Sequence, residues 1–99
     1  MTVELSLKVN DNLIQTDYFV ADFIDHTTSG MVESLEGTGT IRDLNLTIDN
    51  DKVSISLNGM EVSINEFVIK IIKSTTLGMV APLKGVTGPI KKVNLVIRK

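Results

Sequence analysis

Few side chains in this chain of 99 residues have the types and spacing that chemistry needs. His26, the single histidine, follows Asp22 by four residues, so in a helix the two could share a metal ion or exchange a proton. The segment 49–51 carries two carboxylates and an amide but lacks the glycine and closing glutamate of a calcium loop. The absence of cysteine excludes disulfides and thiolate chemistry. We predict no catalytic, metal-binding or cofactor-binding residue, and we leave enzymatic activity open while favouring its absence.

Two glycine-containing segments, 36–40 and 84–89, look like phosphate-binding loops only in composition. Each follows a predicted helix, and the C-terminus of a helix presents carbonyl oxygens and partial negative charge. We interpret both segments as turns, in which Gly37 and Gly85 cap the preceding helices. Pro82, placed in the last turn of the second helix, predicts a kink or a break there.

The segments that would position these residues occur twice. Residues 19–37 match residues 67–85, and after one inserted residue the match continues from 38–48 to 87–97, with 16 identities in 30 aligned positions. The beginnings match more weakly, since Val3, Ser6 and Leu7 align with Val53, Ser56 and Leu57 only if the second turn is two residues shorter. We therefore predict one domain, residues 1–99, built by tandem duplication of two repeats, 1–49 and 50–99.

Each repeat has the pattern strand, strand, helix, strand. Alternating apolar residues open and close it, and Asn58 with Gly59 signals a two-residue hairpin turn. Helical spacing gives each helix one apolar stripe, formed by Phe19, Val20, Phe23, Ile24, Thr27, Met31 and Leu35, and by Phe67, Val68, Ile71, Ile72, Thr75, Met79 and Leu83. We expect an α+β two-layer sandwich of two ββαβ units with pseudo-twofold symmetry. If each hairpin is one bent strand, the order becomes the βαββαβ of a ferredoxin-like domain.

The centre of each helical stripe is made of small residues. A glycine inside a helix costs about 1 kcal/mol relative to alanine, so its presence in both repeats indicates that something approaches the backbone there. One interpretation is packing across the pseudo-twofold axis. The other is a ligand groove between the helices, beside Thr28 and Thr76, lined by Thr27, Gly30, Met31, Thr75, Gly78 and Met79.

Charge differs sharply between the repeats. Residues 1–49 carry nine acidic and two basic side chains, a net charge of −7, whereas residues 50–99 carry three acidic and eight basic side chains, a net charge of +5. The halves should attract each other, and separate molecules could dock acidic face to basic face, in a contact that need not close into a ring. The expected partner surface is Lys70, Lys73, Leu77 and Val80, with Asp22 and Asp25 as the opposing patch.

These patterns favour a small protein-interaction or self-assembling module, with a protein partner or a homo-oligomer. The alternative is a small-molecule binder or enzyme that uses the groove between the helices, and a third hypothesis is weak nucleic-acid binding by the basic half. No apolar run is long enough to cross a membrane, and the N-terminal residues lack a secretory signal. We therefore expect a cytoplasmic protein without membrane contact.

The second repeat also resembles a known group of sequences. Its segments LNGMEVSINEFV, GMV and LKGV, at residues 57–68, 78–80 and 83–86, are similar to short uncharacterised archaeal proteins built as one hairpin, one helix and one strand. The resemblance covers the second repeat and, in degenerate form, the first. It implies that a single-copy relative would pair as a homodimer and that this chain is such a dimer fused, and it implies no activity.

Overall fold

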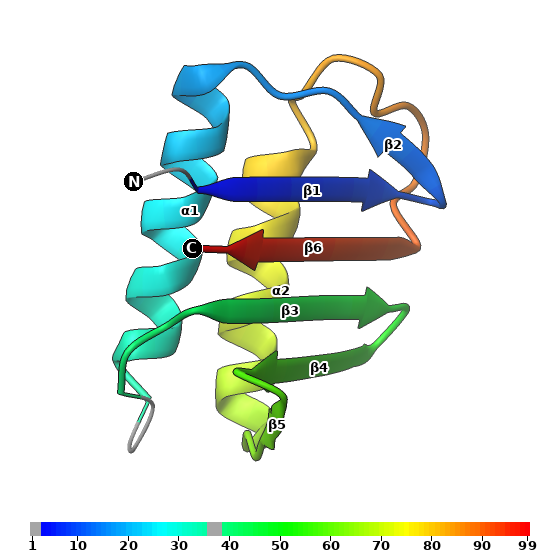
Figure 1. Cartoon of the computed structure of the whole chain (residues 1–99). Helices are drawn as coiled ribbons and strands as arrows, with labels where there is room; N and C mark the ends of the chain where they lie inside the picture. The colour runs from blue at the N-terminus through cyan, green and yellow to red at the C-terminus, as the bar shows by residue number, and fades with distance from the viewer. Residues whose placement is uncertain (1–2, 36–38) are drawn as a thin grey trace.

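The computed structural model describes residues 3–35 and 39–99 and shows an α+β architecture (Figure 1). Within those residues, six antiparallel strands form one sheet in the order β2-β1-β6-β3-β4-β5. The predicted α+β class is confirmed. The strands are β1 (Glu4–Val9), β2 (Asn12–Ile14), β3 (Asp43–Asp49), β4 (Lys52–Leu57), β5 (Met60–Val62) and β6 (Lys92–Arg98). The helices α1 (Tyr18–Glu33) and α2 (Glu66–Val80) cover one face of the sheet and run across its strands in opposite directions (Figure 1).

Each half of the chain opens with a hairpin, so the βαββαβ alternative was wrong. The turns are two residues long, between the paired residues Val9 and Asn12 and between Leu57 and Met60. Both residues of each turn have positive φ, from +50° to +84°, which is the backbone of a type I′ turn. Because the turns have equal length, β1 corresponds to β4 after the same shift of 48 residues as the helices. The two-residue difference expected at the beginnings was therefore wrong.

The four inner strands of the sheet, β1, β6, β3 and β4, come alternately from the two halves of the chain. The last strand of each half lies beside the first strand of the other, because β6 pairs with β1 and β3 pairs with β4. The two last strands, β3 and β6, pair with each other at the centre (Figure 1). Neither half therefore forms a continuous sheet by itself, and most of the ladder joins residues of different halves.

Two asparagines at equivalent places hold this arrangement. The Asn10 side chain accepts hydrogen bonds from the backbone N–H groups of Lys91 and Lys92 and donates one to the carbonyl of Pro89. Asn58 repeats all three bonds with Arg42, Asp43 and Thr40, at distances of 2.7–2.9 Å. Each turn asparagine thus fastens the segment leading into the last strand of the other half.

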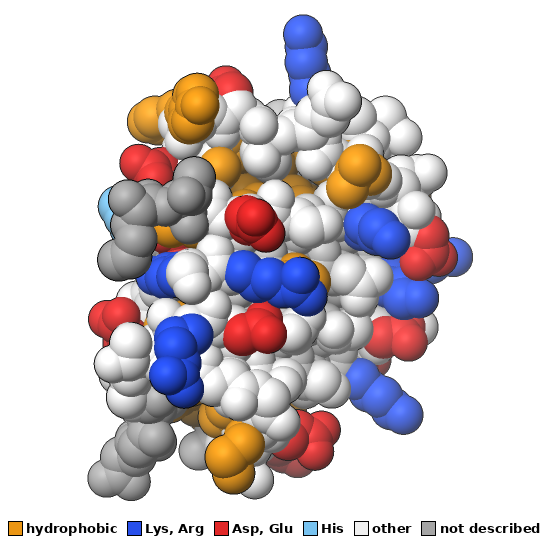
Figure 2. All heavy atoms as spheres, viewed as in Figure 1, with side chains coloured by type: hydrophobic (Ala, Val, Ile, Leu, Met, Phe, Trp, Pro, Cys, Tyr) orange, Lys and Arg blue, Asp and Glu red, His pale blue; other side chains and the backbone are white. Residues whose placement is uncertain are grey.

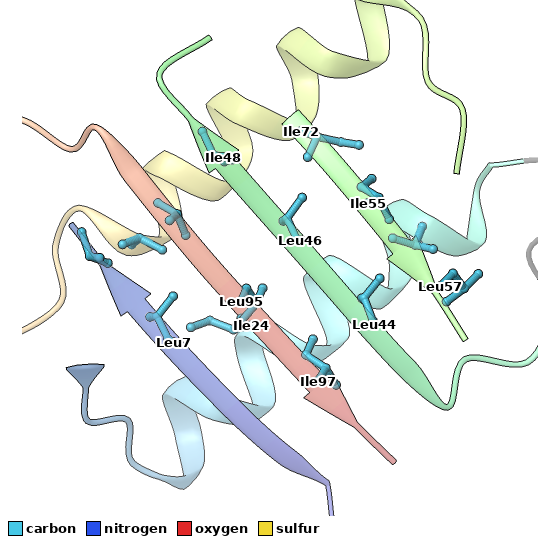
Figure 3. Close-up of a cluster of buried hydrophobic side chains, with 14 of the residues drawn as sticks. Leu7, Ile24, Leu44, Leu46, Ile48, Ile55, Leu57, Ile72, Leu95 and Ile97 are labelled. Carbon is cyan, nitrogen blue, oxygen red and sulfur yellow. The ribbon is translucent and has the colours of Figure 1, made fainter. Parts of the chain in front are cut away.

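The core lies between the sheet and the helices. Leu7, Leu95, Leu46 and Ile55 lie side by side across four strands in the pairing register, and each is at most 1% exposed. Figure 3 shows these side chains and Ile24 of α1 in the same layer. Alternation along the strands places polar side chains on the opposite face of the sheet, as the sequence pattern predicts.

The predicted helical stripes are wrong in part. The residues that α1 buries are Ile24, Asp25, Thr28, Ser29 and Val32, and those that α2 buries are Ile72, Thr76 and Val80. Each helix has two apolar stripes, and only the one built from small and β-branched residues faces the sheet. The stripe with the largest side chains, including Phe19, Phe23, Phe67 and Ile71, remains exposed.

The ends of the helices are set by short local contacts. Asp17 and Asn65 are the N-caps, and the side chain of each accepts a hydrogen bond from the backbone N–H three residues later. The α2 helix ends at Val80, so Pro82 lies beyond it and kinks nothing. Gly85 has a φ of +90° but follows the helix by several residues, so it is a turn residue and no cap. Gly37 lies outside the described residues.

Candidate interaction surface

Large apolar side chains are exposed at equivalent places near the start of each helix, and because the helices run in opposite directions these places lie at opposite ends of the helix layer (Figure 1). Phe19 and Phe23 on α1 are 75% and 54% exposed, and Phe67 and Ile71 on α2 are 70% and 44% exposed. The rings of Phe19 and Phe23 pack against each other with centroids 6.3 Å apart. We call these four residues, together with Gly30 and Gly78, the helix-layer face. Exposed apolar patches of this kind mark interaction sites.

The two helical glycines are open on the side where a Cβ atom would point. Among the described residues, a Cβ atom added at Gly30 or at Gly78 would meet no atom within 4 Å apart from its own stretch of helix. Packing across the centre of the molecule therefore does not explain them, and that interpretation was wrong. Each glycine still weakens its helix by about 1 kcal/mol relative to alanine. Their open positions lie two turns after Phe23 and Ile71, on the same side of each helix.

The other predicted groove residues lie partly buried between or beneath the helices. Thr27, Met31, Thr75 and Met79 are half-buried. Met79 lines a hollow of about 170 Å³ with residues that include Phe19 and Phe23. That volume is below the range of about 300–1,000 Å³ typical of small-molecule sites. A larger hollow of about 690 Å³, lined by residues 12–17 and 83–85, adjoins this one and shares Val20 and Leu83 with it. Thr28 and Thr76 face the sheet and are at most 1% exposed, so their place beside the groove was wrong.

The predicted partner surface is only partly at the surface. Val80 is 1% exposed, and Leu77 packs against the core, so neither offers the expected patch. Asp25, expected on the outer side of α1, is buried instead. Asp22 and Lys70 are exposed, and within residues 3–35 and 39–99 neither takes part in an ion pair.

The remaining two charges of that surface form ion pairs inside the chain. Asp25 lies 3.2 Å from the Nζ atom of Lys99 and accepts a hydrogen bond from Ser29. Lys73, at the equivalent position on α2, donates a hydrogen bond of 2.8 Å to Asp51. This bond and the charge of Lys73 hold the pKa of Asp51 below its usual value. In both pairs a helical side chain reaches a residue just beyond a central strand. The helix supplies the acid in the pair of Asp25 and Lys99 and the base in the pair of Lys73 and Asp51.

Other ion pairs also join acidic and basic halves. Lys92 lies 3.3 Å from Asp11, and Arg98 lies 3.8 Å from Asp43. With Asp25 and Lys99, these pairs each link an acid of residues 1–49 to a base of residues 50–99. Part of the charge separation seen in the sequence is therefore used to hold the chain together.

The opposite face of the sheet is polar. Figure 2 shows this face, on which uncharged atoms predominate and basic side chains lie beside acidic ones. On the central strands β3 and β6 the outward residues are charged at both strand ends and mainly uncharged polar between them, with Asn45 and Asn94 at corresponding places. The helix layer is thus the side on which large apolar side chains are concentrated.

The candidate chemical residues remain separate. Asp22 and His26 are exposed on α1, and the described part of the chain contains no group of three or more histidine, cysteine or carboxylate side chains that could hold a metal ion. Neither of the described helices has the length and apolar character that crossing a bilayer requires. Comparison of the chain with protein-family models, with curated proteins and with solved structures finds no match.

The helix-layer face was missed because Phe19, Phe23, Phe67 and Ile71 were predicted to lie on one buried stripe of each helix. The signal for two stripes is present. Ile24, Thr28 and Val32 recur at intervals of four, as do Ile72, Thr76 and Val80, and these runs suffice to cover a sheet. The phenylalanines at 19 and 23 then form a second stripe that needs another partner.

Proposed function

We propose that this protein is a self-associating interaction module, and that its helix-layer face binds a second copy of the chain. The observation that carries the proposal is the exposure of Phe19 and Phe23 at one end of the helix layer and of Phe67 and Ile71 at the other end (Figure 1). Burying such side chains against a matching surface contributes about 25 cal/mol for each Å² of apolar area removed from water. The module works by association, and none of its residues is assigned a catalytic role.

The dimensions of the molecule support a second copy as the occupant. The chain measures 36 × 34 × 18 Å along its principal axes, so its faces are broad and its layers thin. A standard protein interface buries about 800 Å² on each partner, which a face of this breadth accommodates. Self-association covers the apolar faces of both copies at once, and it leaves the polar faces of both sheets in water.

The test is the molar mass in solution at micromolar concentration and at low and high salt. We expect a species of twice 10.8 kDa for the natural chain. Replacing both Phe19 and Phe67 with serine should give the monomer, with little effect on folding because both side chains are mostly exposed. The matched control is Leu13→Ser, since Leu13 is 65% exposed on β2 but lies outside the helix-layer face. A monomer at all salt concentrations for the natural chain contradicts the proposal.

We also propose that the chain arose by tandem duplication of a ββαβ unit, with pseudo-twofold symmetry between repeats 1–49 and 50–99. The matching bonds of Asn10 and Asn58 and the matching N-caps support this origin. It is consistent with the resemblance to short archaeal proteins that would pair as homodimers. The alternating order of the strands is what a fused, strand-exchanged dimer would have.

Co-expression of residues 1–49 and 50–99 as separate chains tests the duplication. We expect the two chains to associate with each other in preference to themselves, because net charges of −7 and +5 attract. The preference should weaken as salt rises, since the screening length falls from about 10 Å at 0.1 M to about 3 Å at 1 M. Chains that remain unfolded and separate would contradict two autonomous, complementary units.

A further inference from the structure

The two sides of the helix-layer face differ in charge. Phe19 and Phe23 line a hollow together with Met79 of α2, so this side of α1 faces α2. By helical spacing, Asp22 and Glu33 lie on the far side of α1, and both are exposed. The corresponding side of α2 carries Lys70 and, one turn earlier, Glu66. One border of the face is therefore acidic, and the other carries a lysine beside a glutamate.

We infer that the second copy binds in a closed, symmetric dimer in which α1 of each chain lies over α2 of the other. This inference rests on the proposed function and adds the arrangement of the two copies. With the helices of the two copies aligned, two helix layers can be stacked symmetrically in two ways, like helix on like or unlike on unlike. Stacking like on like brings the two acidic borders together, whereas stacking α1 on α2 places each acidic border against the border that carries Lys70. A symmetric contact of this kind contains each pair twice and closes on itself.

Shape supports the same contact. Phe23 precedes Gly30 by seven residues, and Ile71 precedes Gly78 by seven, so each helix shows a large side chain and a gap on one side, two turns apart. Because Phe23 lies beside Met79 and the helices run in opposite directions (Figure 1), Phe23 is level with Gly78. With α1 over α2, Phe23 of one copy would lie over Gly78 of the other, and Ile71 over Gly30. The two open glycines would then receive side chains from the second copy.

The same counting places a charge pair in the dimer. Ten residues along α1 from Phe23 lies Glu33. Because α2 runs in the opposite direction, the same distance from Met79 leads back to residue 69, which is next to Lys70. Within one chain these two side chains lie on opposite borders of the face, too far apart to pair. In the inferred dimer Glu33 faces Lys70 of the second copy, and the contact occurs twice.

The experiment is a charge-exchange cycle in the full-length chain, with the dissociation constant of the dimer measured by sedimentation at low salt. Glu33→Lys and Lys70→Glu should each weaken association by about fivefold, as expected for two exposed pairs that become repulsive. The double variant should return to within about twofold of the natural chain, because both contacts are attractive again. Unfolding curves of all variants should coincide at protein concentrations below the dissociation constant, since neither side chain contributes to the core and dimerisation no longer adds to the stability.

Each outcome decides between the two proposals. Restoration by the double variant supports the arrangement of α1 over α2. If the dimer forms and loses affinity on Phe19→Ser with Phe67→Ser, but the two charge effects simply add, the arrangement is wrong and the proposed function stands. Open, concentration-dependent polymers also contradict the closed dimer alone. A monomeric natural chain, or a dimer insensitive to the phenylalanine changes, overturns both.

Discussion

Asp25 and Lys73 occupy equivalent positions on the two helices, yet they carry opposite charges and differ in burial. The Asp25 side chain is 4% exposed and that of its partner Lys99 is 26% exposed, whereas Lys73 and Asp51 are 30% and 98% exposed. The framework therefore accepts either sign at this position, provided that the residue beyond the central strand changes sign as well. The contribution of each pair to stability depends on burial. Water weakens an exposed ion pair, whereas a buried charge that loses its partner is costly because it is kept from water.

The largest expected effect is the loss of the buried member of this comparison. Asp25→Ala leaves the Lys99 ammonium and the Ser29 hydroxyl without their acceptor, so we expect the free energy of unfolding to fall by about 2–3 kcal/mol. Lys73→Ala, the matched variant, should change it little because its partner Asp51 is in water. Urea denaturation at neutral pH measures both. Equal losses would show that burial does not separate the two pairs.

A second pair of equivalent residues should behave alike. Asn10→Gly and Asn58→Gly keep the positive φ of each turn but remove three side-chain hydrogen bonds to the other half, and we expect each to cost about 1–2 kcal/mol. Asp11→Gly is the control, since it alters the same turn without touching the asparagine bonds. A large loss for one asparagine and none for the other would contradict the equivalence of the two halves.

Much of the framework followed from local patterns, because alternation, turn residues and helical periodicity act over a few neighbours. The α+β class and the Asn58 turn are examples. The hairpin at Asn10 and Asp11 was weaker in the sequence, since an aspartate adopts positive φ less readily than the glycine at the second position of the Asn58 turn. The alternating order of the strands depends on pairing between residues up to 94 positions apart, such as Glu4 with Arg98, and no short-range pattern encodes it.

The site was harder to predict for a different reason. Hydrophobicity identifies residues that gain from burial, but it does not say whether the sheet or another molecule covers them. Phe23 was therefore predicted to be buried, and Asp25 was predicted on the outer side of the helix because helical spacing places it away from the stripe that contains Phe23. The partner of Asp25, Lys99, lies 74 positions away, so only the folded chain shows the pair.

The buried threonines give a third comparison, in which substitution should stabilise the fold. Thr28 and Thr76 occupy equivalent places against the sheet, and among the described residues neither Oγ1 atom has a hydrogen-bond partner. Replacing each with valine, which has the same shape, should raise the free energy of unfolding by about 1 kcal/mol, because a buried hydroxyl without a partner is unfavourable. Thermal and urea unfolding of the single variants measure this. Destabilisation by both would mean that the hydroxyls bind a group inside the fold.

The smallest effect concerns the exposed member of the first comparison. Lys73 lowers the pKa of Asp51 from its usual value of 3.8, so the folded chain favours the charged carboxylate more than the unfolded chain does. The resulting stabilisation is complete above that usual value and is lost as the pH falls through the lowered pKa. We expect the carboxyl resonance of Asp51 to titrate below pH 3.8 in the natural chain and to move toward 3.8 in Lys73→Met. Because Asp51 is in water, 1 M salt should reduce this difference, whereas the pair of Asp25 and Lys99 should respond much less. Equal salt sensitivity of the two pairs would contradict the assignment of one to the interior and the other to the surface.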